Sequence, residues 1–127
     1  MLWGNKVILV IGEILFDLFK NEKQLGGAPF NFAYHLKNLG FPVRYISRIG
    51  NDSHGKEILT LLKQYLFNID DIQIDSHHET GTVLVQLNSS GNPTFRIKPD
   101  VAYDYIGYLP EKHLSLQEKY LWILKVP

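Results

Sequence analysis

Four residues near the N-terminus combine the hydrogen-bonding groups and the backbone freedom that a small-molecule site needs. Asp17 follows an apolar run, Gly26 and Gly27 precede a predicted helix, and Asn31 comes in the first turn of that helix. A carboxylate and an amide bind hydroxyl groups, and glycine permits close approach to the backbone. The first N–H groups of a helix are also free to bind. These residue types suit a neutral ligand that carries hydroxyl groups.

A structural interpretation of the same four residues stays open. The two glycines can be a simple turn, Asp17 a solvated loop charge, and Asn31 an ordinary residue of a first helical turn. Residue types and spacing alone do not decide between the two interpretations.

Other catalytic and metal-binding patterns are weak or missing. Glu13 precedes Asp17 by four residues, but this spacing brings two carboxylates together only on a helix, and the segment is predicted to be extended. Paired-carboxylate catalysis is therefore not predicted. The sequence has no cysteine, which excludes disulfides and thiolate metal sites. The histidines lack metal-ligand spacing, and those at 77–78 are expected to be exposed, so no metal site is predicted.

The charge distribution argues against a nucleic-acid or membrane partner. Thirteen Lys and Arg balance thirteen Asp and Glu, so no basic surface for an anionic polymer or lipid is predicted. The apolar run from Val7 to Phe16 contains Glu13 and is too short to span a bilayer. We therefore expect a soluble, cytoplasmic protein. Asp70, Asp71 and Asp75 are interpreted as turn and surface charges.

The element that leads to Asp17 is predicted to be a buried strand. Residues Val7–Ile11 are continuously apolar, as in a parallel strand that is covered on both faces. The helix that carries Asn31 has Pro29 in its first turn and ends near Gly40 and Pro42.

Alternation of strand and helix continues after this helix. Residues 43–49 predict a second strand, and the turn at 50–53 can cap a second helix. That helix has an apolar stripe from Ile58 to Leu66, and residues 72–74 predict a third strand. A β-α-β-α-β order implies right-handed crossovers and a parallel sheet, so the predicted fold class is α/β.

The pattern changes in the second half of the chain. Thr82–Leu87 and Thr94–Lys98 alternate between apolar and polar residues on either side of a turn at 88–92, which predicts a β-hairpin appended to the sheet. Near the end, residues 115–118 fit a helix capping box, whereas Tyr120–Val126 has the composition of a buried strand. Both interpretations of this last stretch remain open.

The order of these motifs resembles the N-terminal part of PfkB/ribokinase-family sugar kinases, most closely fructokinases. The resemblance extends from about residue 6 to about residue 109, and it covers well under half of a family protein. It rests on Gly12-Glu13, Asp17, Gly26–Asn31, Leu39-Gly40, Arg48–Asp52 with Gly55, Thr80–Thr82, the hairpin, and Asp100–Asp104.

The resemblance implies a partial ribokinase-like fold, with a parallel sheet, flanking helices and a small β-lid. Residues 1–127 would be the N-terminal part of the domain, with lid segments near 13–25 and 80–98. Asp17, Gly27 and Asn31 would hold the acceptor sugar's hydroxyl groups, and Gly26 would shape the loop. Phe95 would face the sugar or pack within the lid. The resemblance also makes a homodimer through the lid an expected assembly.

The resemblance also implies an ATP-dependent sugar kinase that needs Mg²⁺, with its catalytic base and nucleotide site in a C-terminal half. The sequence contains no Gly-Ala-Gly-Asp motif of that half and no P-loop. We therefore expect no catalytic or cofactor-binding residue in this chain, and no kinase activity from it in isolation.

Two other functions remain open. The chain could be a non-catalytic sugar-binding or interaction module derived from such a kinase. A nucleotide-binding α/β domain is less well supported, because no G-x-G-x-x-G and no cation occur in the loop at 26–31. The sugar is also open: overall resemblance favours fructose, whereas ribose, 2-keto-3-deoxygluconate and nucleosides use the same scaffold.

Overall fold

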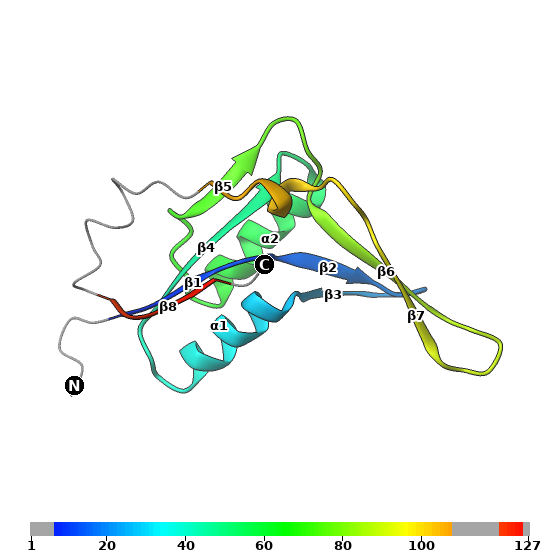
Figure 1. Cartoon of the computed structure of the whole chain (residues 1–127), viewed down its shortest axis with the longest axis horizontal. Coiled ribbons are helices and arrows are strands. Elements are labelled where there is room, and N and C mark those ends of the chain that lie inside the picture. The colour runs from blue at the N-terminus through cyan, green and yellow to red at the C-terminus, as the bar shows by residue number, and fades with distance from the viewer. Residues whose placement is uncertain (1–6, 108–119, 126–127) are drawn as a thin grey trace.

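The computed structural model describes residues 7–107 and the backbone of residues 120–125, which are arranged around two β-sheets (Figure 1). The first sheet has the strand order β5-β4-β1-β8, and all its strands are parallel. Its strands are β1 (Val7–Ile11), β4 (Val43–Gly50), β5 (Ile72–Asp75) and β8 (Tyr120–Lys125). The predicted parallel sheet is confirmed, and so is the strand interpretation of the last stretch. The capping box expected at 115–118 lies outside the described residues.

The first strand is apolar throughout because both of its faces are buried. Ile8 and Val10 face the larger core, whereas Leu9 and Ile11 pack with Ile46 in a second cluster. Leu9 and Val10 are both fully buried. The unbroken apolar run, rather than an alternating one, is the sequence signature of this double burial.

Helices α1 (Ala28–Asn38) and α2 (Ser53–Gln64) cover the same face of the first sheet, as their shared core shows (Figure 1). Pro29 lies in the first turn of α1, where its missing N–H costs nothing. Asp52 caps α2 by accepting a 2.8 Å hydrogen bond from the backbone N–H of Gly55. Both predicted helices are confirmed, but α2 ends at Gln64, so Leu66, the last residue of the predicted apolar stripe, lies beyond the helix and is 80% exposed.

The second sheet has the strand order β3-β2-β6-β7 and extends away from the first (Figure 1). It contains β2 (Leu15–Leu18), β3 (Lys23–Gly26), β6 (Gly81–Leu87) and β7 (Pro93–Ile97). The antiparallel β6–β7 pair is the predicted hairpin. Parallel pairing of β2 with β6 joins this hairpin to the segment that carries Asp17.

Two aspartates that were interpreted as surface charges are in fact buried. Asp71 is 6% exposed and forms an ion pair with Arg44. Asp75 is 2% exposed, and its carboxylate accepts a 2.9 Å hydrogen bond from Arg48 Nε. Each arginine lies on β4, 27 residues before its partner, so no local sequence signal shows the pairing. Buried carboxylates are stable in such positions only when they are paired.

The expectation for the adjacent histidines is half correct. His77 is exposed, whereas the half-buried ring of His78 stacks on Tyr105 with a centroid distance of 3.9 Å. Tyr105 belongs to a short 3-10 helix, η1 (Ala102–Tyr105), which this stacking attaches to the segment before β6. The backbone N–H of Ala102 adds a 2.7 Å hydrogen bond to the carbonyl of Glu79 in the same segment. In the part of the chain that the structure describes, no helix is long and apolar enough to cross a membrane.

Candidate functional site

The candidate site begins where the chain passes from the first sheet to the second. Gly12, Glu13 and Ile14 connect β1 to β2. The buried hydroxyl of Tyr45 on β4 donates to the carbonyl of Glu13 and lies 3.3 Å from that of Gly12. These bonds fix the connection, and with it the position of β2.

Asp17 lies in the middle of the second sheet, on β2 rather than at the end of β1. In register, Asp17 is opposite Gln24 on β3 and Val83 on β6, and Val83 is opposite Ile97 on β7. Directly paired residues point to the same face of a sheet. Asp17 therefore shares one face with Val83 and Ile97.

Gly26 and Gly27 are required by their surroundings. A Cβ atom on Gly26 would lie 2.6 Å from Oδ2 of Asp17, so the carboxylate fills the space of the missing side chain. Gly27 has φ of 100°, in the left-handed region that favours glycine. A Cβ there would also lie 3.1 Å from the carbonyl oxygen of Glu13. The glycine pair thus lets the start of α1 approach both acidic residues closely.

The carboxylate of Asp17 is half-buried and lacks a partner. Burial raises its pKa above the ordinary value. Among residues 7–107 no group donates a hydrogen bond to it. The carboxylate is therefore partly accessible and free of protein donors in this part of the chain, so it can accept hydrogen bonds from an external donor.

Glu13 also lies at the start of α1, although its four-residue spacing from Asp17 did not predict a catalytic role for it. Its side chain contacts Gly27 and accepts a hydrogen bond from the backbone N–H of Ala28. Burial raises the pKa of Glu13, the bond from Ala28 lowers it, and the nearby Asp104 raises it further. The Glu13 carboxylate thus accepts a hydrogen bond from one of the N–H groups that have no partner within α1.

The structure places Asn31 and Phe95 farther from this centre. The exposed Asn31 donates its backbone N–H to the carbonyl of Gly27 at 2.9 Å, and its side chain lines a groove between β3, α1 and α2 of about 550 Å³. Phe95 lies opposite Val85, on the face of Asp17 but one pair farther out, and is 65% exposed. Asp17, Gly26 and Gly27 therefore come together, whereas Asn31 and Phe95 lie at the periphery.

Tyr103 is a further residue at the centre that the sequence did not single out. A Cβ on Gly81 would lie 2.2 Å from Cε2 of Tyr103, so the ring rests directly on this glycine. Tyr103 also packs against Leu15 and Val83. A glycine inside a strand often marks close approach of another group, and Gly81 is the signal that could have pointed to Tyr103.

Nothing in the described part of the chain forms a metal site: residues 7–107 contain no group of three or more His, Asp or Glu that could hold a metal ion.

A family model for pfkB family carbohydrate kinases matches residues 3–118, nearly the whole chain. The chain belongs to this family. A sugar kinase of Pyrococcus horikoshii is 35% identical over 108 residues, which are 76% of this chain and 34% of that protein. A fructokinase of Salmonella typhimurium is 32% identical over 96 residues, or 72% of this chain and 31% of that protein.

Solved structures of a sugar kinase and of a fructokinase have the same fold. The P. horikoshii kinase in complex with ATP superimposes with a TM-score of 0.69 at 35% identity, over 76% of this chain and 35% of that one. A fructokinase of Xylella fastidiosa with bound ATP has a TM-score of 0.81 at 24% identity, over 95% of this chain and 39% of that one. The chain thus spans about a third of the length of the curated relatives it matches.

Proposed function

We propose that this chain forms the acceptor-sugar site of an ATP-dependent sugar kinase, with fructose as the acceptor. The observation that carries the proposal is the partnerless, half-buried carboxylate of Asp17 above Gly26. It lies within the segment that matches the pfkB family. The choice of fructose is supported by the name fructokinase among the similar proteins.

In this proposal the hydroxyl groups of the sugar donate hydrogen bonds to the Asp17 carboxylate. The two glycines allow the sugar to approach the backbone at the start of α1. Asn31, in the first turn, is proposed to contact the sugar at the periphery. A neutral polyol satisfies the carboxylate without bringing a second charge into a partly desolvated place.

We propose that the second sheet acts as a lid over the sugar. Asp17 shares a face with apolar side chains of β6 and β7, including Val83, Phe95 and Ile97. Phe95 and Ile97 are 65% and 64% exposed, so they are free to cover a ligand. Exclusion of water by such a cover strengthens the hydrogen bonds inside.

ATP supplies the transferred phosphoryl group in this reaction, and Mg²⁺ neutralises charge on it. We assign both, together with the catalytic base, to residues outside this chain. The sequence has no P-loop and no Gly-Ala-Gly-Asp motif, and residues 7–107 contain no group of three or more possible metal ligands. The use of ATP is the reason for which we propose a cytoplasmic location.

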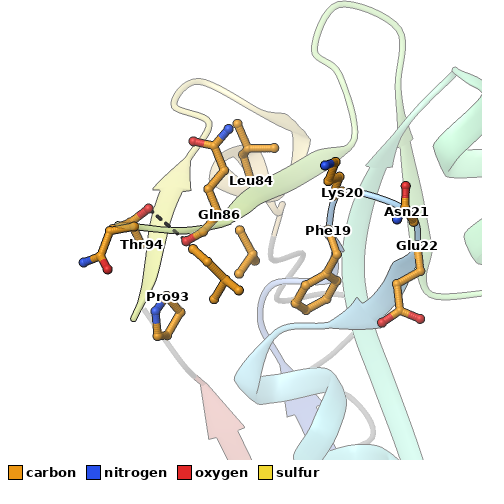
Figure 2. A pocket seen from close by; sticks show the side chains of 11 residues that line it. Phe19, Lys20, Asn21, Glu22, Leu84, Gln86, Pro93 and Thr94 are labelled. Atoms are coloured by element: carbon orange, nitrogen blue, oxygen red, sulfur yellow. Dashed lines mark hydrogen bonds between the residues drawn. The ribbon is translucent and has the colours of Figure 1, made fainter. Parts of the chain in front are cut away.

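A homodimer through the second sheet is the assembly that we propose. β7 is an edge strand of this sheet, and all of its residues are exposed. The turn at 19–22 and the outer ends of β6 and β7 line a hollow (Figure 2). Its volume is about 1010 Å³. Leu87, in the wall of this hollow, is 72% exposed. A second copy that pairs with β7 would cover this apolar surface.

Phosphate transfer tests the proposed function. The complete product of the reading frame that contains this chain is expected to release ADP from ATP in the presence of fructose, and the isolated 127-residue chain is expected to show background release only. If the complete product binds fructose without turnover, the alternative of a non-catalytic sugar-binding module is favoured. Turnover by the isolated chain would contradict the assignment of catalysis to other residues.

A further inference from the structure

Three residues on neighbouring strands of the second sheet form a row beneath the proposed sugar site. Leu15 on β2 is opposite Gly26 on β3 and also opposite Gly81 on β6. The three therefore share one face, with the leucine between two glycines. Since neighbouring strands lie about 4.8 Å apart, the two glycines are roughly 10 Å apart.

The space above each glycine is filled by a side chain from elsewhere in the sequence. The Asp17 carboxylate lies above Gly26, where a Cβ would be 2.6 Å from Oδ2. The Tyr103 ring lies above Gly81, where a Cβ would be 2.2 Å from Cε2. A carboxylate and an aromatic ring thus flank the buried side chain of Leu15 from opposite sides.

Tyr103 is held in this position by packing and keeps its polar end free. Its half-buried side chain packs against the cluster formed by Leu15, Val83 and Val85. Within residues 7–107 its hydroxyl makes no hydrogen bond. Burial raises the pKa of Tyr103, and the nearby carboxylates of Glu13 and Asp104 raise it further, so the neutral phenol is favoured. A buried tyrosine usually finds a hydrogen-bond partner for its hydroxyl, and here that partner remains to be supplied.

We propose that Tyr103 forms the wall of the acceptor site opposite Asp17, and that its ring limits the size of the sugar. The inference rests on the proposed function and adds the residue that selects among acceptors. Ligand sites combine aromatic walls with a few polar groups that fix orientation. In this arrangement Asp17 binds the hydroxyl groups, while the ring of Tyr103 packs against the C–H face of the sugar.

The experiment compares acceptors of different size in the complete product of the reading frame. Fructose is measured against two disaccharides that contain a fructose unit, with wild type, Tyr103→Ala and Tyr103→Phe. Tyr103→Ala is expected to raise the KM for fructose about tenfold. For at least one disaccharide, the ratio of its kcat/KM to the kcat/KM for fructose is expected to rise about tenfold. A tenfold change equals about 1.4 kcal/mol. Tyr103→Phe keeps the ring and is expected to keep the wild-type ratio.

Tyr105→Ala is the matched control, because Tyr105 belongs to the same 3-10 helix but stacks on His78. It is expected to leave the acceptor ratio unchanged even if it lowers stability. Should Tyr103→Ala fail to fold, Tyr103→Leu retains apolar packing on Leu15 and is expected to shift the ratio in the same direction. Equal loss of activity on all acceptors would overturn the inference. Absence of phosphate transfer by wild type to any sugar would instead overturn the proposed function.

Discussion

The carboxylate of Asp17 occupies the space that a side chain on Gly26 would need, with Oδ2 2.6 Å from the position of a Cβ atom. The two residues lie on adjacent strands, β2 and β3, and the other carboxylate of this hairpin, that of Glu22, is exposed. A side chain at this position would therefore collide with the Asp17 carboxylate. Its replacement would change the orientation of the proposed ligand-binding group.

Gly26→Ala is expected to raise the KM for the sugar about tenfold, because the added methyl group displaces the carboxylate by steric contact. Thermal stability is expected to change little, since the carboxylate can turn toward solvent. Steady-state kinetics of the complete product give the KM. Gly107→Ala is the matched control, because a Cβ there meets nothing closer than 3.6 Å. An unchanged KM in Gly26→Ala would show that the orientation of Asp17 is unimportant.

A buried hydrogen-bond network fixes the start of β6 to the first sheet. The Thr80 hydroxyl accepts a 2.9 Å bond from the backbone N–H of Gly50 and donates a 2.6 Å bond to Asp52. Thr80→Val leaves that N–H without a partner and is expected to lower the free energy of unfolding by about 1–3 kcal/mol. Thr80→Ser keeps the hydroxyl and is expected to cost about 1 kcal/mol. Urea denaturation of monomeric protein measures both, and equal costs would contradict this account.

The same network predicts a dependence on pH. Burial raises the pKa of Asp52, but hydrogen bonds from Thr80 and Gly55 outweigh this and hold it below its ordinary value. A carboxylate with a lowered folded pKa stabilises the fold above its unfolded pKa of about 3.9, and this stabilisation is lost as pH falls through the folded pKa. The difference in stability between wild type and Thr80→Val is therefore expected to be largest at neutral pH and to shrink under acid conditions. A difference in stability that stays constant with pH would contradict this role of Asp52.

The exposed edge of the second sheet predicts self-association. β7 has a free edge and carries Phe95 and Ile97, which are both well exposed. The 127-residue chain is expected to form dimers or larger species at micromolar concentration, and Ile97→Lys to shift it toward monomer, because a charge on an edge strand opposes pairing. Sedimentation velocity measures the distribution. A wild-type chain that stays monomeric at high micromolar concentration would exclude this interface.

Much of the fold could be predicted because its signals are local. The apolar run at Val7–Ile11, Pro29 in a first turn and Asp52 as a helix cap each depend on a few neighbouring residues. The buried pairs of Asp71 and Asp75 could not be predicted, because their arginines lie on another strand. The burial of a charged residue can be predicted only when the residue that pairs with it is known.

Only part of the candidate site could be predicted, because only some of its residues have local sequence signals. Gly26 and Gly27 stand out beside a helix start, whereas the placement of Asp17 depends on parallel pairing between β2 and β6, more than 60 residues apart in sequence. Tyr103 reaches the site through its close approach to Gly81 and its packing against the cluster that contains Leu15 and Val83. Long-range pairing of this kind leaves almost no trace in local composition.

The acceptor kinetics of Asp17→Asn, measured with the complete product of the reading frame, test the central claim most directly. A hydrogen bond to a charged group contributes about 1.5–3 kcal/mol, so kcat/KM for the sugar is expected to fall at least about tenfold. The affinity for ATP, measured without sugar, should stay the same. Glu22→Gln, which removes an exposed carboxylate from the same hairpin, should leave both values unchanged. Sugar kinetics that are unaffected by Asp17→Asn, or an equal loss of sugar and ATP affinity, would contradict the assignment of this carboxylate to the sugar site.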